Sequence, residues 1–165
     1  MQQQPSYTLF EEEQSFRNTW VWNLVLVSGF TPTLLILVLG LSDPAMKKDL
    51  WWILLAVIGI QALNIGVFSV IRLHTVVAPE GIYYRWWPFF RSWTFLPAGD
   101  ITECVYRKWD RFKWGFSVRK GWGRCHNVNG KDGFRVVLKD GRQFYIGTQA
   151  LPAFQQALQR MERPK

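Results

Sequence analysis

The sequence predicts an α+β membrane protein in which two apolar helices precede a small domain of antiparallel strands. Two observations carry this prediction. Residues 20–41 and 50–71 contain no charged side chain. From residue 74 onward, short segments of mixed polarity are separated by turn sequences. The first pattern is typical of membrane helices, and the second is typical of an antiparallel sheet.

Each apolar run is long enough to cross a bilayer once. A helix of 22 residues is about 33 Å long, and the hydrocarbon core of a bilayer is about 30 Å thick. Because only residues 42–49 separate the runs, we expect an antiparallel helical hairpin. We interpret residues 1–19 as a separate N-terminal segment. The first run exceeds the usual length of a signal-peptide core, so we expect it to be retained.

Flanking charge predicts the orientation of this hairpin. Cytoplasmic segments carry an excess of Lys and Arg. The outer ends of the runs hold four such residues against two in the connecting loop: Arg17, Arg72, Arg85 and Arg91 against Lys47 and Lys48. We therefore expect a multi-pass protein of the inner (plasma) membrane with both termini in the cytoplasm.

Two groups of side chains suit a compact membrane anchor. Small residues recur at steps of three and four in the second run, which places them on one helix face for helix–helix packing. These are Ala56, Gly59, Ala62, Gly66 and Ser69. Tryptophans at or near the ends of the runs are expected to lie at the membrane interface. They are Trp20, Trp22, Trp51, Trp52, Trp86 and Trp87. The amides of Asn23, Gln61 and Asn64 are interpreted as interhelical hydrogen-bonding groups rather than as a transport path.

Residues 74–165 are expected to form one domain of about seven strands closed by a helix. The clearest hairpin is 134–138 and 143–146 around Asp140-Gly141, because an Asp-Gly pair suits a tight turn. Other strands are expected to begin near Thr75, Ile82, Ser92, Ile101 and Lys113. Over 151–161, apolar residues repeat at helical spacing and predict a capping helix. These are Leu151, Phe154, Leu158 and Met161.

Several segments carry a resemblance to a known group of proteins. They are 81–89 (GIYYRWWPF), 121–123 (GWG), 127–130 (NVNG) and 146–149 (IGTQ). With the preceding hairpin, they resemble bacterial membrane proteins that contain a pleckstrin-homology-like (PH-like) domain. The resemblance implies an antiparallel PH-like barrel with a C-terminal helix. Residues 75–84 have no Lys or Arg and contain Glu80, whereas phosphoinositide-binding members carry a basic pattern there, so it implies docking or assembly instead.

The basic charge of the chain follows the second run. Residues 72–165 hold seventeen Lys or Arg and seven Asp or Glu, a net charge of +10. The densest cationic stretch is interleaved with aromatic residues, and we predict that it is a membrane-surface or partner patch. Its members are Arg107, Lys108, Trp109, Arg111, Phe112, Lys113, Trp114, Arg119, Lys120 and Arg124. This patch could contact anionic lipid, form a solvated face, or stack nucleic-acid bases.

Glu11, Glu12 and Glu13 carry the acidic charge nearest the N-terminus. They are expected either to pair with the basic domain or to begin the first helix.

No catalytic, cofactor-binding or metal-binding residue is predicted, and the expected function is non-catalytic. The sequence has no H-E-x-x-H, G-x-S-x-G or phosphate-loop pattern. The sequence instead favours a membrane-anchored domain that docks a protein, as a partner or a second copy, or contacts anionic lipid.

Two alternatives stay open beside this reading. One is a membrane-tethered nucleic-acid-binding domain. The other is a small enzyme with a site assembled by folding from Asp100, Glu103 and His126, or a metal site from Cys104, Cys125 and His126.

Overall fold

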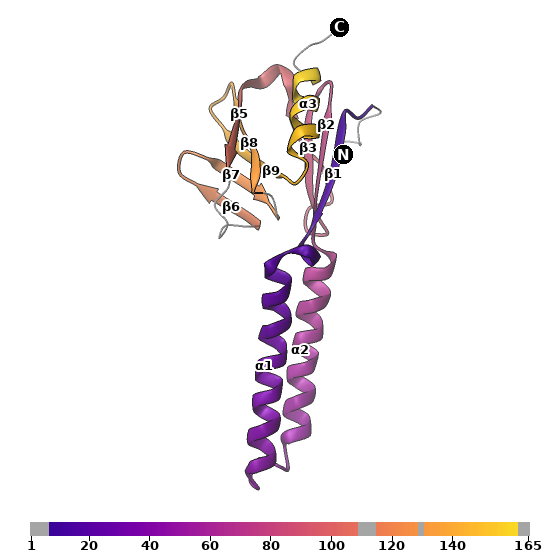
Figure 1. Cartoon of the computed structure of the whole chain (residues 1–165), viewed down its shortest axis with the longest axis vertical. Helices are drawn as coiled ribbons and strands as arrows, with labels where there is room; N and C mark the ends of the chain where they lie inside the picture. Colours follow the sequence, from indigo (N-terminus) through magenta and orange to yellow (C-terminus); the bar gives the residue numbers. More distant parts are fainter. Residues whose placement is uncertain (1–6, 109–114, 129–130, 162–165) are drawn as a thin grey trace. The chain divides into compact units, whose positions relative to one another are not determined.

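The computed structural model describes residues 7–108, 115–128 and 131–161 and consists of two compact units (Figure 1). One unit runs from Phe16 to Val70 and contains the two long helices. The other combines the chain up to Ser15 with the chain from Ile71 onward. The helical unit is therefore an insertion between two segments of a β unit.

The helical unit confirms the predicted hairpin. A short 3-10 helix, η1 (Phe16–Asn18), precedes α1 (Trp20–Ser42), and α2 (Leu50–Val70) follows the connecting loop. The Thr19 side chain accepts a hydrogen bond from the Trp22 backbone N–H and so caps α1. Both helices are long and apolar enough to cross a membrane, with mean hydropathies of 2.3 and 2.2.

Two glycines of α1 bring the helices close together. A Cβ at Gly29 would lie 2.0 Å from the Gln61 amide, and one at Gly40 would lie 2.3 Å from the Leu50 side chain. The Gln61 Nε2 also donates to the Val25 carbonyl oxygen at 2.8 Å. A glycine surface on α1 therefore receives side chains from α2. The prediction of interhelical amides is confirmed for Gln61 and wrong for Asn64, whose Nδ2 donates to the Ile60 carbonyl of its own helix at 3.2 Å.

The small residues of α2 lie differently from the prediction. Ala62 lines a groove between the helices together with Gly29 and Gln61. A Cβ at Gly59 or Gly66 would meet no atom within 4 Å, and Ala56 is exposed. Ser69 donates within its own helix, to the Gly66 carbonyl. Most of this predicted packing face is thus left uncovered by α1, because the close approach uses the glycines of α1 instead.

The β unit contains two separate sheets in the described part of the chain. The first has the antiparallel order β1-β2-β3-β4 and the second has the order β5-β8-β9-β7-β6. Their strands are β1 (Phe10–Ser15), β2 (Arg72–Ala78), β3 (Gly81–Trp87), β4 (Thr94–Pro97), β5 (Ile101–Lys108), β6 (Gly115–Arg119), β7 (Gly123–Asn127), β8 (Asp132–Leu138) and β9 (Gln143–Thr148). A 3-10 turn, η2 (Ala98–Asp100), connects the sheets.

Strand β1 corrects the prediction of a separate N-terminal segment. It pairs with β2 along its whole length, from Phe10 opposite Val77 to Ser15 opposite Arg72. The Gln14 side chain is 1% exposed. Its Nε2 donates to the Gly147 carbonyl at 2.7 Å, and its Oε1 accepts from the Val128 N–H at 3.2 Å. The glutamates therefore lie in a strand that joins the two sheets, and do not begin a helix.

The prediction of one antiparallel barrel of about seven strands is also corrected. The β8–β9 hairpin forms at Asp140-Gly141 as expected, with Gly141 at a φ of +82°. The structure adds β1 and β7, and β7 pairs with β9 in parallel. No ladder joins the two sheets within the described ranges. The chain passes from the first sheet to the second at η2, so the consecutive strands β4 and β5 belong to different sheets and no barrel closes.

The C-terminal helix α3 (Leu151–Met161) confirms the predicted amphipathic pattern. Phe154, Leu158 and Met161 are buried. The Phe154 ring lies 5.2 Å from the Phe10 ring of β1 and 5.2 Å from the Phe134 ring of β8. One helix face thus fills the core between the two sheets.

Replacing Gln14 with Leu should destabilise the β unit. The change leaves the Gly147 carbonyl and the Val128 N–H buried without their partner, at a cost of about 2–4 kcal/mol. The exposed residue Glu11 on the same strand offers the control, and Glu11→Ala should change the unfolding free energy by less than about 0.5 kcal/mol. Urea unfolding of the detergent-solubilised chain, followed by tryptophan fluorescence, measures both. Equal shifts for the two variants would contradict the bridging role of Gln14.

Gly29→Ala should weaken the helical hairpin, whereas Gly59→Ala should not. Because Ala has a higher helix propensity than Gly, each substitution alone should stabilise its helix by about 1 kcal/mol. The difference in stability between the two variants therefore measures helix–helix packing. The new methyl group at position 29 displaces the Gln61 amide from Val25, at a cost of about 1–2 kcal/mol. An SDS titration in mixed micelles, followed by circular dichroism, measures this difference. The packing assignment fails if Gly29→Ala is as stable as Gly59→Ala.

Candidate functional site

The predicted basic patch is divided by the fold. Arg107 and Lys108 lie exposed at the end of β5, whereas Lys120 and Arg124 lie exposed at the tip of the β6–β7 hairpin and on β7. Strands β5 and β6 form opposite edges of the second sheet. Four strand spacings of about 4.8 Å put these edges about 19 Å apart. Trp109, Arg111, Phe112, Lys113 and Trp114, and the side chain of Arg119, lie outside the described residues.

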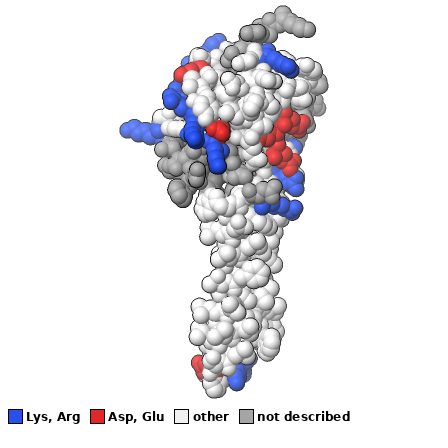
Figure 2. All heavy atoms as spheres, in the orientation of Figure 1, with Lys and Arg blue, Asp and Glu red and all other residues white. Residues whose placement is uncertain are grey.

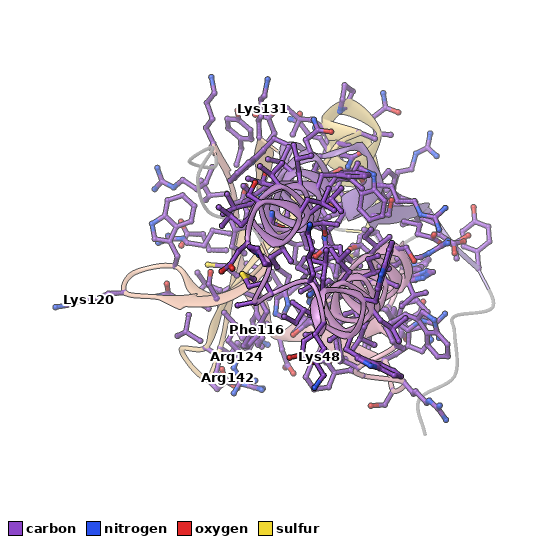
Figure 3. All side chains as sticks on the ribbon, turned by 90° about the horizontal axis from the view of Figure 1, so that it is seen from below. Lys48, Phe116, Lys120, Arg124, Lys131 and Arg142 are labelled. Carbon is purple, nitrogen blue, oxygen red and sulfur yellow. The ribbon has the colours of Figure 1, made fainter. Side chains whose placement is uncertain are left out.

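A cleft between the two sheets is lined in part by Arg124, a member of this patch. It has a volume of about 160 Å³. The walls come from β3, β4, β6, β7 and the turn after β3, and comprise Tyr84, Arg85, Trp86, Phe90, Thr94, Phe116, Arg124 and His126. Figure 3 shows Phe116 and Arg124 close to Arg142, with Lys120 at the end of a loop that extends away from them. Arg124 is thus the predicted cation that lines the cleft.

The register of β6 and β7 explains why these side chains meet. Phe116 pairs with His126, and Val118 pairs with Arg124. Side chains two apart in a strand share one face, so all four lie on the same face of the sheet. The Tyr84 ring of the first sheet lies 4.3 Å from the His126 ring. This face therefore turns toward the first sheet and forms one wall of the cleft.

His126 is the central polar group of the cleft and is 3% exposed. Its Nδ1 accepts a hydrogen bond from the Trp86 Nε1–H at 2.9 Å. Burial, reinforced by the positive charge of Arg124, lowers the pKa of His126 to about 4. The imidazole is therefore neutral near pH 7, with its proton on Nε2. That N–H has no hydrogen-bond partner among the described residues.

Tyr84 faces the same positive charges. Burial raises the pKa of its hydroxyl. A hydrogen bond with Thr94 and the charges of Arg124 and Arg142 act in the opposite direction. Arg142 is held by Asp140, with its Nε 2.6 Å from the Asp140 Oδ2. No carboxylate pairs with Arg124 in the described part of the chain.

Exposed apolar side chains line the cleft at Phe90 and Phe116 and continue beyond it to Val118 on the same face of β6. Phe90 is 59% exposed, Phe116 57% and Val118 73%. We call Phe90, Phe116 and Val118 the apolar rim. Trp87 and Phe89, in and after β3, are also exposed. Trp86 is buried and bonded to His126, so its predicted place at the membrane interface is wrong.

Strand β1 changes the charge distribution of the β unit. Its three glutamates lower the net charge of this unit from +10 to +7. Glu13 pairs with Arg72, and Glu12 accepts hydrogen bonds from the Thr148 hydroxyl and the Gln149 N–H at 2.6 and 2.7 Å. Figure 2 shows a compact acidic group on the side of the β unit where β1 lies, and basic side chains at the opposite edge. The glutamates of β1 thus neutralise charge on their own side of the β unit, at Arg72.

The catalytic and metal-binding alternatives are not assembled by this fold. Three strand spacings, about 14 Å, separate β5, which carries Glu103 and Cys104, from β7, which carries Cys125 and His126. Glu103 instead pairs with Arg135 at 2.9 Å. Within the described ranges, no group of three His, Cys, Asp or Glu side chains could hold a metal ion.

From the sequence, His126 was expected only as a metal ligand or catalytic residue, and its place in the cleft was not predicted. The available signal was the alternation in two neighbouring segments, Phe116-x-Val118 and Arg124-x-His126. Read as paired strands, these segments place two apolar and two basic side chains on one face. No sequence pattern indicated that Tyr84 and Trp86 would line the same cleft, because these residues belong to the other sheet.

The chain was compared with known proteins, and no family model, curated protein or solved structure matches it.

The His126 imidazole should remain neutral down to about pH 4, which NMR titration of its ring resonances would measure. An unfolded chain binds this proton near pH 6.5 and the folded chain near pH 4. Stability from this residue is therefore complete above pH 6.5 and is lost as the pH falls to about 4, by about 3 kcal/mol in total. His126→Asn keeps an acceptor for Trp86 but cannot titrate, so the stability of the unmodified chain relative to this variant should fall by about 3 kcal/mol between pH 6.5 and pH 4. A His126 resonance that titrates near pH 6.5 would refute this assignment.

Proposed function

We propose that the chain is an integral membrane protein whose helical hairpin anchors a non-catalytic, PH-like β unit that binds an anionic membrane surface. The observation that carries this proposal is the apolar rim, which has Arg124 beside Phe116 at the cleft and Lys120 beyond Val118 at the tip of the hairpin. On the water-exposed surface of a protein, a contiguous patch of apolar side chains marks an interaction site. Apolar side chains bordered by cations suit the boundary between lipid headgroups and acyl chains.

Chain connectivity supports lipid as the occupant of this surface. Strand β1 ends at Ser15 and α1 begins at Trp20, while α2 ends at Val70 and β2 begins at Arg72. Segments this short tether the β unit to any bilayer that the helices cross. Because a tethered surface meets the adjacent lipid at a high effective concentration, even a weak contact is populated. Lys120 and Arg124 would each contribute about 1 kcal/mol near an anionic surface.

The topology of this proposal follows the flanking charges. Both termini and the β unit lie in the cytoplasm, and Lys47 and Lys48 lie on the other side. An anionic cytoplasmic leaflet then faces a β unit with a net charge of +7. An active alkaline phosphatase fusion at the C-terminus, together with a dark fluorescent-protein fusion, would overturn this orientation.

The membrane contact predicts protection of β6 and β7 that depends on lipid charge. The full chain is reconstituted in nanodiscs of phosphatidylcholine, with or without about 30% phosphatidylglycerol. Hydrogen exchange of residues 115–127 should slow by at least threefold in the anionic nanodiscs. Raising the salt from about 0.15 M to about 0.5 M should remove the protection, since it shortens the Debye length.

Charge-reversed variants test which surface is involved. Lys120→Glu/Arg124→Glu should abolish the difference between the two lipid compositions. Lys139→Glu/Arg160→Glu makes the same change in charge at exposed positions on the β8–β9 turn and α3, and should preserve the difference. The proposed contact would be refuted if the unmodified chain exchanged at the same rate in both lipid compositions. It would also be refuted if both variants lost the lipid-dependent protection to the same extent.

A further inference from the structure

The cleft between the sheets contains an unused hydrogen-bond donor. The Trp86 Nε1–H donates a hydrogen bond to Nδ1 of His126, so the proton of this neutral ring lies on Nε2. The ring is 3% exposed, and Nε2 has no partner among the described residues. A buried donor without a partner costs about 1–3 kcal/mol. Five buried side-chain atoms of the described residues have no hydrogen-bond partner, and two of them, His126 Nε2 and Arg85 Nε, belong to residues that line this cleft, where a group from outside can accept hydrogen bonds from them.

A cation lies on the same face as this donor. Arg124 and His126 are two residues apart on β7, so both side chains point to the face that forms the cleft wall. Arg124 is exposed and has no carboxylate partner in the described chain. Arg85 also borders the cleft, but its guanidinium lies over the Trp93 ring at 4.3 Å. Arg124 and the His126 N–H therefore form the part of the site that receives an anion, and the Arg85 Nε is a second buried donor of the cleft without a hydrogen-bond partner among the described residues.

The remaining walls are mostly aromatic. Tyr84 and Phe116 lie 4.3 and 5.3 Å from the His126 ring, and Phe90 borders the same space. The volume of about 160 Å³ would hold roughly five water molecules at about 30 Å³ each. Sites for drug-sized ligands are larger, about 300–1,000 Å³. The cleft thus fits a charged group attached to one ring or one short branched chain.

We propose that this cleft binds a small organic monocarboxylate that carries an aromatic or branched apolar group. One carboxylate oxygen accepts from the His126 Nε2–H, and the Arg124 guanidinium pairs with the carboxylate. The apolar group lies against Tyr84 and the apolar rim. Phe116 covers His126 and is 57% exposed, so its ring turns outward to admit the ligand without disturbing the core.

Charge and surface favour a monocarboxylate over inorganic phosphate. Arg124 pairs with the single carboxylate, and the second guanidinium of the cleft, that of Arg85, lies over the Trp93 ring, whereas phosphate would place a second negative charge between aromatic walls. An inorganic anion would also leave the aromatic surface without an apolar partner. The proposed site goes beyond membrane contact, because its binding requires no lipid.

Phenylacetate tests this proposal with the full chain in a neutral detergent. Binding is followed by the His126 ring resonances and by tryptophan fluorescence, since Trp86 contacts this ring. We expect saturable shifts at millimolar phenylacetate. Phenylacetamide, the neutral analogue of similar shape, should bind at least tenfold more weakly. Absence of saturable shifts up to about 10 mM, or equal binding of the amide, would overturn the site.

A matched pair of variants checks the role of Arg124. Arg124→Gln should weaken phenylacetate binding at least tenfold, whereas Arg160→Gln, the same change at an exposed position of α3, should leave it unchanged. Both residues are exposed, so folding should be retained and is confirmed by the unfolding curves. Equal affinity of the Arg124→Gln variant and the unmodified chain would refute the proposal. Inorganic phosphate that binds as tightly as phenylacetate would refute the assignment to an apolar carboxylate.

Discussion

The pairing of β1 with β2 is the interaction on which the rest of the structure depends. The two strands belong to segments that the helical hairpin separates in sequence, and Ser15 lies directly opposite Arg72. The insertion must therefore start and finish at neighbouring strand ends. An antiparallel pair of helices meets this requirement, because its two ends lie on the same side, about 8–10 Å apart. Short connections then suffice on both sides.

This pairing also holds the two sheets together. Gln14 hydrogen-bonds the Gly147 carbonyl of β9 and the N–H of Val128, which directly follows β7, and Glu12 binds the segment that leads into α3. Phe154 packs on Phe10 from the first sheet and Phe134 from the second. The cleft around His126 has one wall from each sheet. Its geometry therefore depends on contacts made by a strand that is distant in sequence from every cleft residue.

The pairing of β1 with β2 also sets the charge distribution of the β unit. The glutamates of β1 neutralise groups at one edge of the β unit, and they leave the cations of the β6–β7 hairpin without carboxylate partners in the described chain. Those cations border the apolar rim and the buried neutral ring of His126. A surface that combines unneutralised cations, exposed aromatic side chains and an unused N–H donor is suited to anionic, partly apolar ligands. The proposed membrane contact and the proposed carboxylate site both use this surface.

The sequence by itself determined the local elements. The uncharged runs gave α1 and α2 because helix length and apolar composition are properties of one segment. The same holds for the β8–β9 turn at Asp140-Gly141 and for the apolar face of α3. Only the tertiary structure decided which strands pair. It placed the glutamates in β1, put β7 parallel to β9, and divided the predicted basic patch between two sheet edges. The physical reason is that strand pairing joins residues distant in sequence, and their hydrogen bonds leave no periodic pattern in either segment alone.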